Sequence, residues 1–292
     1  MTALLPILIV LVAFVVYVYF TRWRERRLRS RPFPTAWLAI LESSLPVYPA
    51  LSQEEQARLC QLVKLFIAKK RFYGCGGVVI TDEIRVTIAA QACLLLLNKG
   101  WSLYPKLTAI LVYPTAFTVD REQHQADGTV VTGSHGLLGE SWHNGRVILS
   151  WDDVEKGVGD FADGHNVVLH EFTHQLDAES GSMDGAPALR SNSYKSWAKV
   201  FDDNFEDLKF RYEHGQSTVI DEYGTTNPAE FFAVATETFF EMPHQLHKHR
   251  PELYEELRHF YQVDPRQWSV QGEHSGQPER EGMPPGNALQ SR

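Results

Sequence analysis

The chain has 292 residues, 43% of them apolar, so it is long enough for one large domain or two small ones with a substantial core. Its net charge of −8 combines +5 from residues 21–31 with −13 from the residues after them. Because the chain after residue 31 is so acidic, it lacks the basic surface that a nucleic-acid binder needs. We therefore expect no direct nucleic-acid binding. The three cysteines, an odd and sparse set, argue against a disulfide framework and fit a reducing compartment.

The N-terminal stretch Ala3–Phe20 is uncharged and overwhelmingly apolar. As a helix it would extend about 27 Å, close to the roughly 30 Å of a bilayer's hydrocarbon core. A cleaved signal peptide would carry its positive charge before the apolar run and small residues after it, and neither is present. Six arginines follow the run instead: Arg22, Arg24, Arg26, Arg27, Arg29 and Arg31. The pattern predicts a single-pass helix in the inner (cytoplasmic) membrane, with the following domain in the cytoplasm.

The chain is expected to divide into three parts. Residues 1–31 form the transmembrane anchor and its basic juxtamembrane segment. The helix of this segment ends at Pro32-Phe33-Pro34. Residues 32–268 form the folded domain. Residues 269–292 are rich in Gly, Pro, Gln and Glu, a composition that predicts a disordered polar tail.

The folded part is predicted to be mostly helical with a small sheet. Hydrophobic periodicity, caps and breakers indicate helices at about residues 52–70, 81–97, 165–178, 194–212, 228–242 and 252–261. Residues 108–113, 129–132 and 145–151 have the β-branched, apolar character of strands that form a sheet before the third of these helices.

The motif His170-Glu171-Phe172-Thr173-His174 lies on that third helix. Two histidines four residues apart lie on one helix face, so both imidazoles can bind a single ion. A glutamate beside the first histidine reaches the water that completes the coordination of a hydrolytic zinc ion. The sequence therefore predicts a zinc site with His170 and His174 as ligands, which needs a third ligand from elsewhere.

The helix that begins at Asn227-Pro228 offers Glu230, Glu237 and Glu241 as a third ligand, and Glu230 is the favoured candidate. A buried carboxylate on this apolar helix needs a partner, because an unpaired one is costly. Glu230 also occupies the position at which a capping box places a glutamate. The histidines after Pro243, at positions 244, 247 and 249, compete for the role, so the residues alone leave the third ligand open.

Three segments together resemble the Mlc titration factor A family of zinc peptidases. They read DEIRVTIAAQA over Asp82–Ala92, HEFTHQLD over His170–Asp177 and NPAEFFAV over Asn227–Val234, and the resemblance extends over roughly Phe66–Pro265. It implies an α+β, zincin-like metallopeptidase domain of the gluzincin type, similar in its metal site to the catalytic domain of anthrax lethal factor. On the sequence reading this domain is preceded by one N-terminal transmembrane helix.

The resemblance also implies roles for particular residues. His170, His174 and Glu230 become ligands of one Zn²⁺ per chain, Glu171 the general base, and Tyr223 the hydroxyl that stabilises the oxyanion. Tyr223 is otherwise read as an aromatic flanking a turn. Asp177 and Glu237 are candidates for orienting a ligand imidazole.

The expected activity is hydrolysis of peptide bonds in a peptide or protein substrate, with a leaning toward aminopeptidase action that the resemblance supplies. The rival interpretation is a regulator that sequesters a transcriptional repressor resembling Mlc at the membrane without turnover. An intact Glu171 weighs against a purely binding role. A structural zinc site is disfavoured, because such sites have four ligands and are rich in cysteine.

Overall fold

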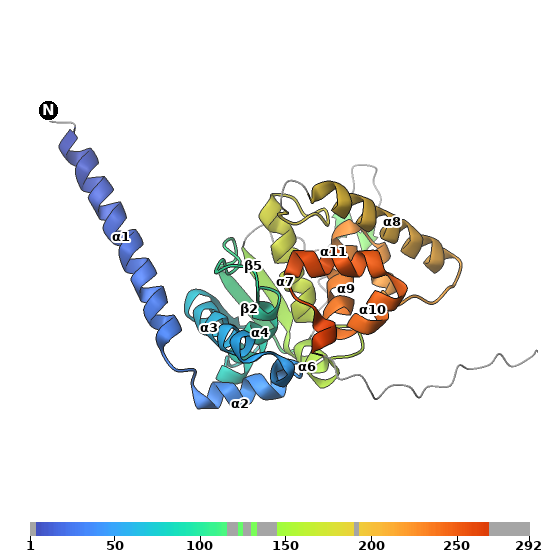
Figure 1. Ribbon diagram of the computed structural model, residues 1–292, viewed down its shortest axis with the longest axis horizontal. Coiled ribbons are helices and arrows are strands. Elements are labelled where there is room, and N and C mark those ends of the chain that lie inside the picture. Colours follow the sequence, from blue (N-terminus) through green and yellow to red (C-terminus); the bar gives the residue numbers. More distant parts are fainter. Residues whose placement is uncertain (1–3, 116–121, 125–129, 133–144, 190–192, 269–292) are drawn as a thin grey trace, which may run out of the picture.

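The computed structural model describes residues 4–115, 122–124, 130–132, 145–189 and 193–268, and side chains over 9–115, 145–189 and 193–268. Figure 1 shows helix α1 extending away from a body in which a small sheet lies between two groups of helices. The described helices are α1 (Leu4–Ser30), α2 (Thr35–Ser44), α3 (Gln53–Lys69), α4 (Asp82–Leu94), α6 (Trp151–Gly159), α7 (Val167–Asp177), α8 (Tyr194–Glu213), α9 (Pro228–Glu241), α10 (Pro243–His249) and α11 (Pro251–Tyr261). The predicted tail over 269–292 lies outside the described residues.

A three-stranded parallel sheet forms from β1 (Arg71–Gly74), β2 (Ala109–Tyr113) and β5 (Arg146–Ser150), in the order β1-β2-β5. Arg71 pairs with Ala109 and Ala109 with Arg146, so the three strands begin at the same level. Alternate residues along the strands point to opposite faces. Ile110, Val112, Val147 and Leu149 are buried in the core on one face, whereas the residues between them are wholly or partly exposed.

The strands predicted at 108–113 and 145–151 are confirmed as β2 and β5, but the strand predicted at 129–132 is not part of this sheet. It corresponds to β4 (Val130–Thr132), which pairs antiparallel with β3 (Glu122–His124) in a separate two-stranded sheet. The third strand of the main sheet is β1, which the sequence analysis missed. Basic residues at the end of a helix and the glycines that follow indicated only a helix end and a turn there.

Each predicted helix of the folded part is present. Ser52 caps α3 in a reciprocal capping box with Glu55, and Asn227 caps α9 with Pro228 in its first turn. Three further helices were not predicted, α2, α6 and α10. Helix α6 begins at Trp151, which had been assigned to the preceding strand, and Pro243 both follows α9 and starts α10, since proline fits the first turn of a helix.

The N-terminal helix α1 carries large exposed apolar side chains; Val10 and Tyr19, for example, are 68% and 72% exposed. In the part of the chain that the structure describes, no helix is both long and apolar enough to cross a membrane. The transmembrane helix predicted at Ala3–Phe20 is therefore not found there. Its first residues lie among residues 1–8, whose side chains are outside the described part.

Helix α7 occupies the interior of the body, where α4, α6, α9 and β5 all contact it. Its Phe172 is fully buried, with ring centroids 5.6 Å from Phe66 and 4.9 Å from Tyr104. A large apolar side chain in such a position contributes about 3–5 kcal/mol to stability. The helix that carries both motif histidines is thus held rigidly by the core.

Candidate metal centre

The local sequence fixes where α7 begins. The side-chain oxygen of Asn166 accepts hydrogen bonds from the backbone N–H groups of Val168 (3.1 Å) and Leu169 (3.0 Å). This N-cap satisfies two donors that have no partner within the helix. His170 and His174 then follow one turn apart, with their ring centroids 4.8 Å from each other.

Helix α9 brings Glu230 to these histidines. Asn227 caps the helix by accepting from the N–H groups of Ala229 and Glu230, at 2.9 and 3.0 Å. The Glu230 carboxylate points to the histidines, with one oxygen 2.9 Å from His170 Nε2 and 3.3 Å from His174 Nε2. Of the two interpretations of Glu230, the geometry therefore favours the ligand over the capping glutamate.

The competing histidines do not join this group. Residues 244, 247 and 249 lie on α10, and the cluster of potential metal ligands found among the described residues consists of His170, His174 and Glu230. The ligand atoms of the three residues all lie within 4.8 Å of one another, and the two histidine Nε2 atoms are 3.1 Å apart.

The chemistry of this donor set fits a divalent cation. Two imidazole nitrogens and one carboxylate oxygen, held that close, direct lone pairs at a common point, and two histidines with one glutamate form a frequent ligand set of catalytic metal sites. No ion is present. The three residues are thus arranged so that they can hold a metal ion, and their roles as ligands remain a prediction.

Glu237 fixes the orientation of the His170 ring. One of its carboxylate oxygens lies 2.7 Å from His170 Nδ1. Because a carboxylate only accepts, Nδ1 donates to Glu237, which turns Nε2 toward Glu230. Burial lowers the pKa of His170, but the charges and hydrogen bonds of Glu237 and Glu230 outweigh it and raise that pKa well above its usual value. Glu237 therefore has the place of a residue that orients a metal-ligating histidine.

The same helix α9 also holds the start of α7. The second carboxylate oxygen of Glu237 accepts from the backbone N–H of Asn166 at 2.5 Å. Glu241 accepts from the Asn166 side-chain amide at 3.0 Å and from the Gly164 N–H at 3.1 Å. Asn166 and Gly164 were not predicted as residues of the site, and Glu241 was predicted only as one of the acidic candidates for the third ligand. An asparagine directly before an apolar helical run is the one sequence signal that could have identified the cap.

A second contact joins the far end of α7 to the start of α9. Asp177 accepts from the backbone N–H of Gly185 at 2.8 Å, and the Trp197 indole donates to the Gly185 carbonyl at 2.9 Å. Gly185 has a φ of +79°, and a Cβ there would lie 2.5 Å from the carbonyl oxygen of Pro228. Asp177 therefore positions the loop against which the ligand-bearing helix begins.

Tyr223 and Glu171 line one cleft together with His170, one of the three candidate ligands. The cleft has a volume of about 350 Å³, and His165, Asp221 and Glu237 contribute to its wall. Glu171 is only 3% exposed.

Tyr223 lies on a 3₁₀ turn (Glu222–Thr225) that Asp221 caps by accepting from the Tyr223 N–H at 2.8 Å. Its ring centroid lies 5.9 Å from that of His170. Burial, together with the charges of Glu230, Glu171 and Glu237, raises the pKa of Tyr223 above its usual value, so its hydroxyl remains a proton donor at neutral pH.

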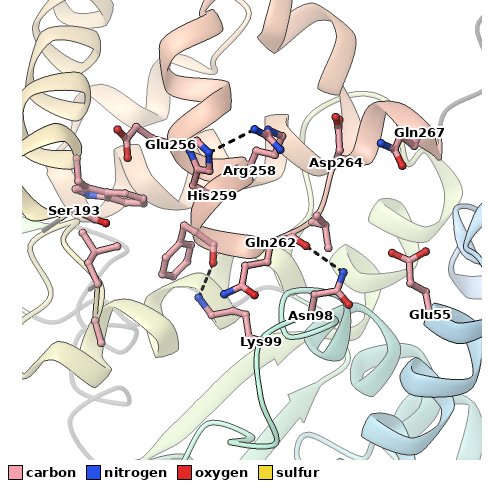
Figure 2. Close-up of a pocket in the computed structure, with 15 residues that line it drawn as sticks. Glu55, Asn98, Lys99, Ser193, Glu256, Arg258, His259, Gln262, Asp264 and Gln267 are labelled. Carbon is pink, nitrogen blue, oxygen red and sulfur yellow. Dashed lines mark hydrogen bonds between the residues drawn. The ribbon is translucent and has the colours of Figure 1, made fainter. Parts of the chain in front are cut away.

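A separate cavity of about 790 Å³ lies between α11 and the segment that follows α4 (Figure 2). Its basic group Lys99 donates to the carbonyl oxygen of Phe260 at 3.0 Å, and Asn98 donates to that of Gln262 at 3.1 Å. These side chains tie the two segments together. The cavity contains none of the predicted site residues.

The fold and this site define a metallopeptidase-like protein with a histidine–histidine–glutamate group that can hold a metal ion. The chain belongs to the family described as glucose-regulated metallo-peptidase M90, whose model matches residues 20–262.

Three relatives show how far the similarity extends. A Synechocystis sp. protein called uncharacterized protein slr2042 is 44% identical over 265 residues, covering 89% of this chain and 96% of that protein. Mlc titration factor A of Klebsiella pneumoniae is 34% identical over 227 residues, covering 77% and 85% of the two chains. That of Serratia proteamaculans is 30% identical over 239 residues, covering 80% and 90%. The family resemblance seen in the sequence is confirmed.

Replacing Glu237 with Gln should weaken metal binding about 10- to 100-fold, because the amide cannot accept from both His170 Nδ1 and the Asn166 N–H. Competition with a chelating indicator measures the affinity. Glu206→Gln, at an exposed glutamate on α8, is the matched control and should bind metal like the unchanged chain. Equal affinities in the two variants would contradict the orienting role.

Replacing Gly185 with Ala should lower both stability and metal affinity, since the added Cβ displaces Pro228 and with it the start of α9. Gly215→Ala is the control, because Gly215 also has a positive φ (+63°) but nothing within 4 Å of its Cβ position. Backbone strain alone costs about 1–3 kcal/mol in each variant. Metal titration with urea denaturation separates the effects, and unchanged metal affinity in Gly185→Ala would refute the coupling.

Proposed function

We propose that this protein is a zinc-dependent peptidase that hydrolyses peptide bonds. The observation that carries the proposal is the convergence of His170, His174 and Glu230 beside a cleft that Glu171 and Tyr223 line. Two histidines and a glutamate are a set that zinc uses in peptidases with an open coordination position. When bound, zinc lowers the pKa of a coordinated water and polarises the scissile carbonyl.

The residues of the chain then have distinct tasks. Glu171, next to a ligand histidine on α7, is the general base that takes the proton of the attacking water and passes it to the departing amine. Tyr223 keeps its proton and donates a hydrogen bond to the developing oxyanion. Glu237 holds His170 with Nε2 facing the metal position. The leaning toward aminopeptidase action belongs to this proposal as well.

A second candidate function is sequestration of a transcriptional repressor, and the relatives named Mlc titration factor A favour it. Binding of this kind needs an exposed surface of the chain but no turnover. The two functions are separable, because a variant without the general base loses hydrolysis and keeps a binding surface.

We also propose that the chain is attached to the inner (cytoplasmic) membrane by the N-terminal part of α1, with the peptidase domain on the cytoplasmic side. The apolar side chains of α1 are exposed, and arginines follow them directly. Positive charge after an apolar helix favours the cytoplasmic side for that end.

Glu171→Gln should abolish hydrolysis of a peptide panel while zinc remains bound, because the amide cannot accept the water's proton but leaves the three ligands in place. Zinc content by mass spectrometry and cleavage with and without a chelator are the measurements. Activity retained in this variant would refute the peptidase assignment. Loss of hydrolysis with unchanged capture of an Mlc-like repressor would show that the regulatory function does not need turnover.

Tyr223→Phe should lower kcat about 100- to 1,000-fold, the typical cost of removing one oxyanion donor, with little change in KM. Steady-state kinetics on a cleaved peptide measure both constants. Tyr212→Phe, on the exposed surface of α8, is the control and should behave like the unchanged enzyme. A raised KM with unchanged kcat would instead assign Tyr223 to substrate binding.

A further inference from the structure

The outer face of the three-stranded sheet carries a groove of about 830 Å³ that the metal chemistry does not use. The residues that give it its character are basic or apolar: Lys69, Lys70, Arg71, Tyr73, Leu111 and Arg146. No acidic side chain lines the groove within the part of the chain that the structure describes. Lys69 is paired with Glu25, and Lys70 donates to the carbonyl oxygens of Tyr104 and Leu107. Arg71 and Arg146 therefore supply the exposed positive charge of the groove.

The exposed face of the sheet is a candidate binding surface. Parallel sheets are usually covered on both faces. Within the described part of the chain, Ile110 and Val147 are buried on one face, whereas the other face combines the buried Ala109 with exposed side chains. On the other face Tyr73 is 48% exposed, and Arg71 and Arg146 are exposed on the two edge strands. Two exposed arginines at the same level of the sheet, on either side of Ala109 of the central strand, favour an anionic ligand.

The groove and the metal cleft lie at opposite ends of the sheet. Arg71 and Arg146 are the first residues of β1 and β5, so they mark the amino ends of the strands. At the carboxyl end of β5, Ser150 caps α6, and Asp153 and Lys156 of α6 line the metal cleft. A surface that contacts the groove therefore leaves the cleft accessible.

Contacts between α1 and α3 show which end of the sheet lies toward the apolar part of α1. Lys64 donates to the carbonyl oxygens of Arg29, at 2.9 Å, and Arg31, and Lys69 forms an ion pair with Glu25 at 2.6 Å. Helices α3 and α1 therefore run antiparallel. The C-terminal end of α3, where the groove begins, is directed toward the apolar residues.

The distance along α1 from the apolar run to the contact with α3 is compatible with a nearby membrane surface. Glu25 is five residues after Phe20, the last residue of the apolar run, which amounts to about 8 Å along a helix. That is within the Debye length of roughly 8–10 Å at physiological salt, the range over which an anionic leaflet attracts basic side chains.

We propose that the basic groove binds anionic lipid headgroups and turns the metal cleft away from the bilayer. This proposal rests on the membrane attachment proposed above and adds the orientation of the domain to it. The cleft then takes its peptide substrates from the aqueous phase, not from the membrane.

The test uses the full chain in nanodiscs made of phosphatidylcholine alone or with phosphatidylserine. Hydroxyl-radical footprinting read by mass spectrometry measures the oxidation rate of Tyr73. We expect this rate to fall severalfold with phosphatidylserine, whereas Tyr194 and Tyr212, exposed on α8, keep their rates. Each basic side chain near an anionic leaflet contributes about a fivefold change in the contact equilibrium.

Arg71→Glu/Arg146→Glu should restore the Tyr73 rate to that in phosphatidylcholine. The matched control, Lys195→Glu/Lys248→Glu, makes the same charge change at exposed positions of α8 and α10 and should keep the protection. Equal Tyr73 rates in both lipids, with the chain inserted, would overturn the groove proposal alone. A chain that enters neither nanodisc would overturn the membrane attachment with it, and protection by a DNA duplex but not by phosphatidylserine would assign the groove to nucleic acid.

Discussion

The contact between α7 and α9 is the interaction on which the metal centre depends. Glu230, Glu237 and Glu241 are spaced by seven and four residues, so they lie on one face of α9. Each meets a group of α7 or of the loop before it: an imidazole, the backbone of the N-cap, or the cap's side chain. The helix that carries the proposed third ligand thereby also fixes the position of the helix that carries the other two.

Three carboxylates on one buried helix face are costly unless each has a partner. This cost is visible at Glu241. Burial, together with the charges of Glu237 and Asp163, raises the pKa of Glu241 to about 8, although Asn166 and Gly164 donate hydrogen bonds to it. At Glu230, hydrogen bonds from the two histidines outweigh the effect of burial and lower the pKa below its usual range. A divalent cation held by His170, His174 and Glu230 offsets part of this negative charge. The centre is therefore built for a cation on electrostatic grounds as well as by its geometry.

The sheet places this centre relative to the rest of the molecule. Because its strands are parallel, all their carboxyl ends lie on the side where α6 begins and the cleft opens. Their amino ends lie on the side where α3 ends and contacts α1. The proposed metal chemistry and the proposed membrane contact would thus use opposite ends of one sheet.

The sequence by itself determined the features that depend on neighbours along the chain. The spacing of His170 and His174 follows from the helical period, and the starts of α3 and α9 follow from local capping. It could not choose the third ligand, because Glu230 is 60 residues from His170 and a capping role explained it equally well. It also missed β1, whose short segment becomes a strand only by pairing with β2.

Tertiary structure decided these points through contacts between distant segments. Packing of α9 on α7 directs Glu230 to the histidines and brings Glu237 to His170 across 67 residues of sequence. Among the described residues, the histidines of α10 lie outside the site, and β3 and β4 form a sheet of their own. The local pattern fixes which side chains share a helix face, but only the packing of helices decides which faces meet, because the free energy of burial depends on partners far away in the chain.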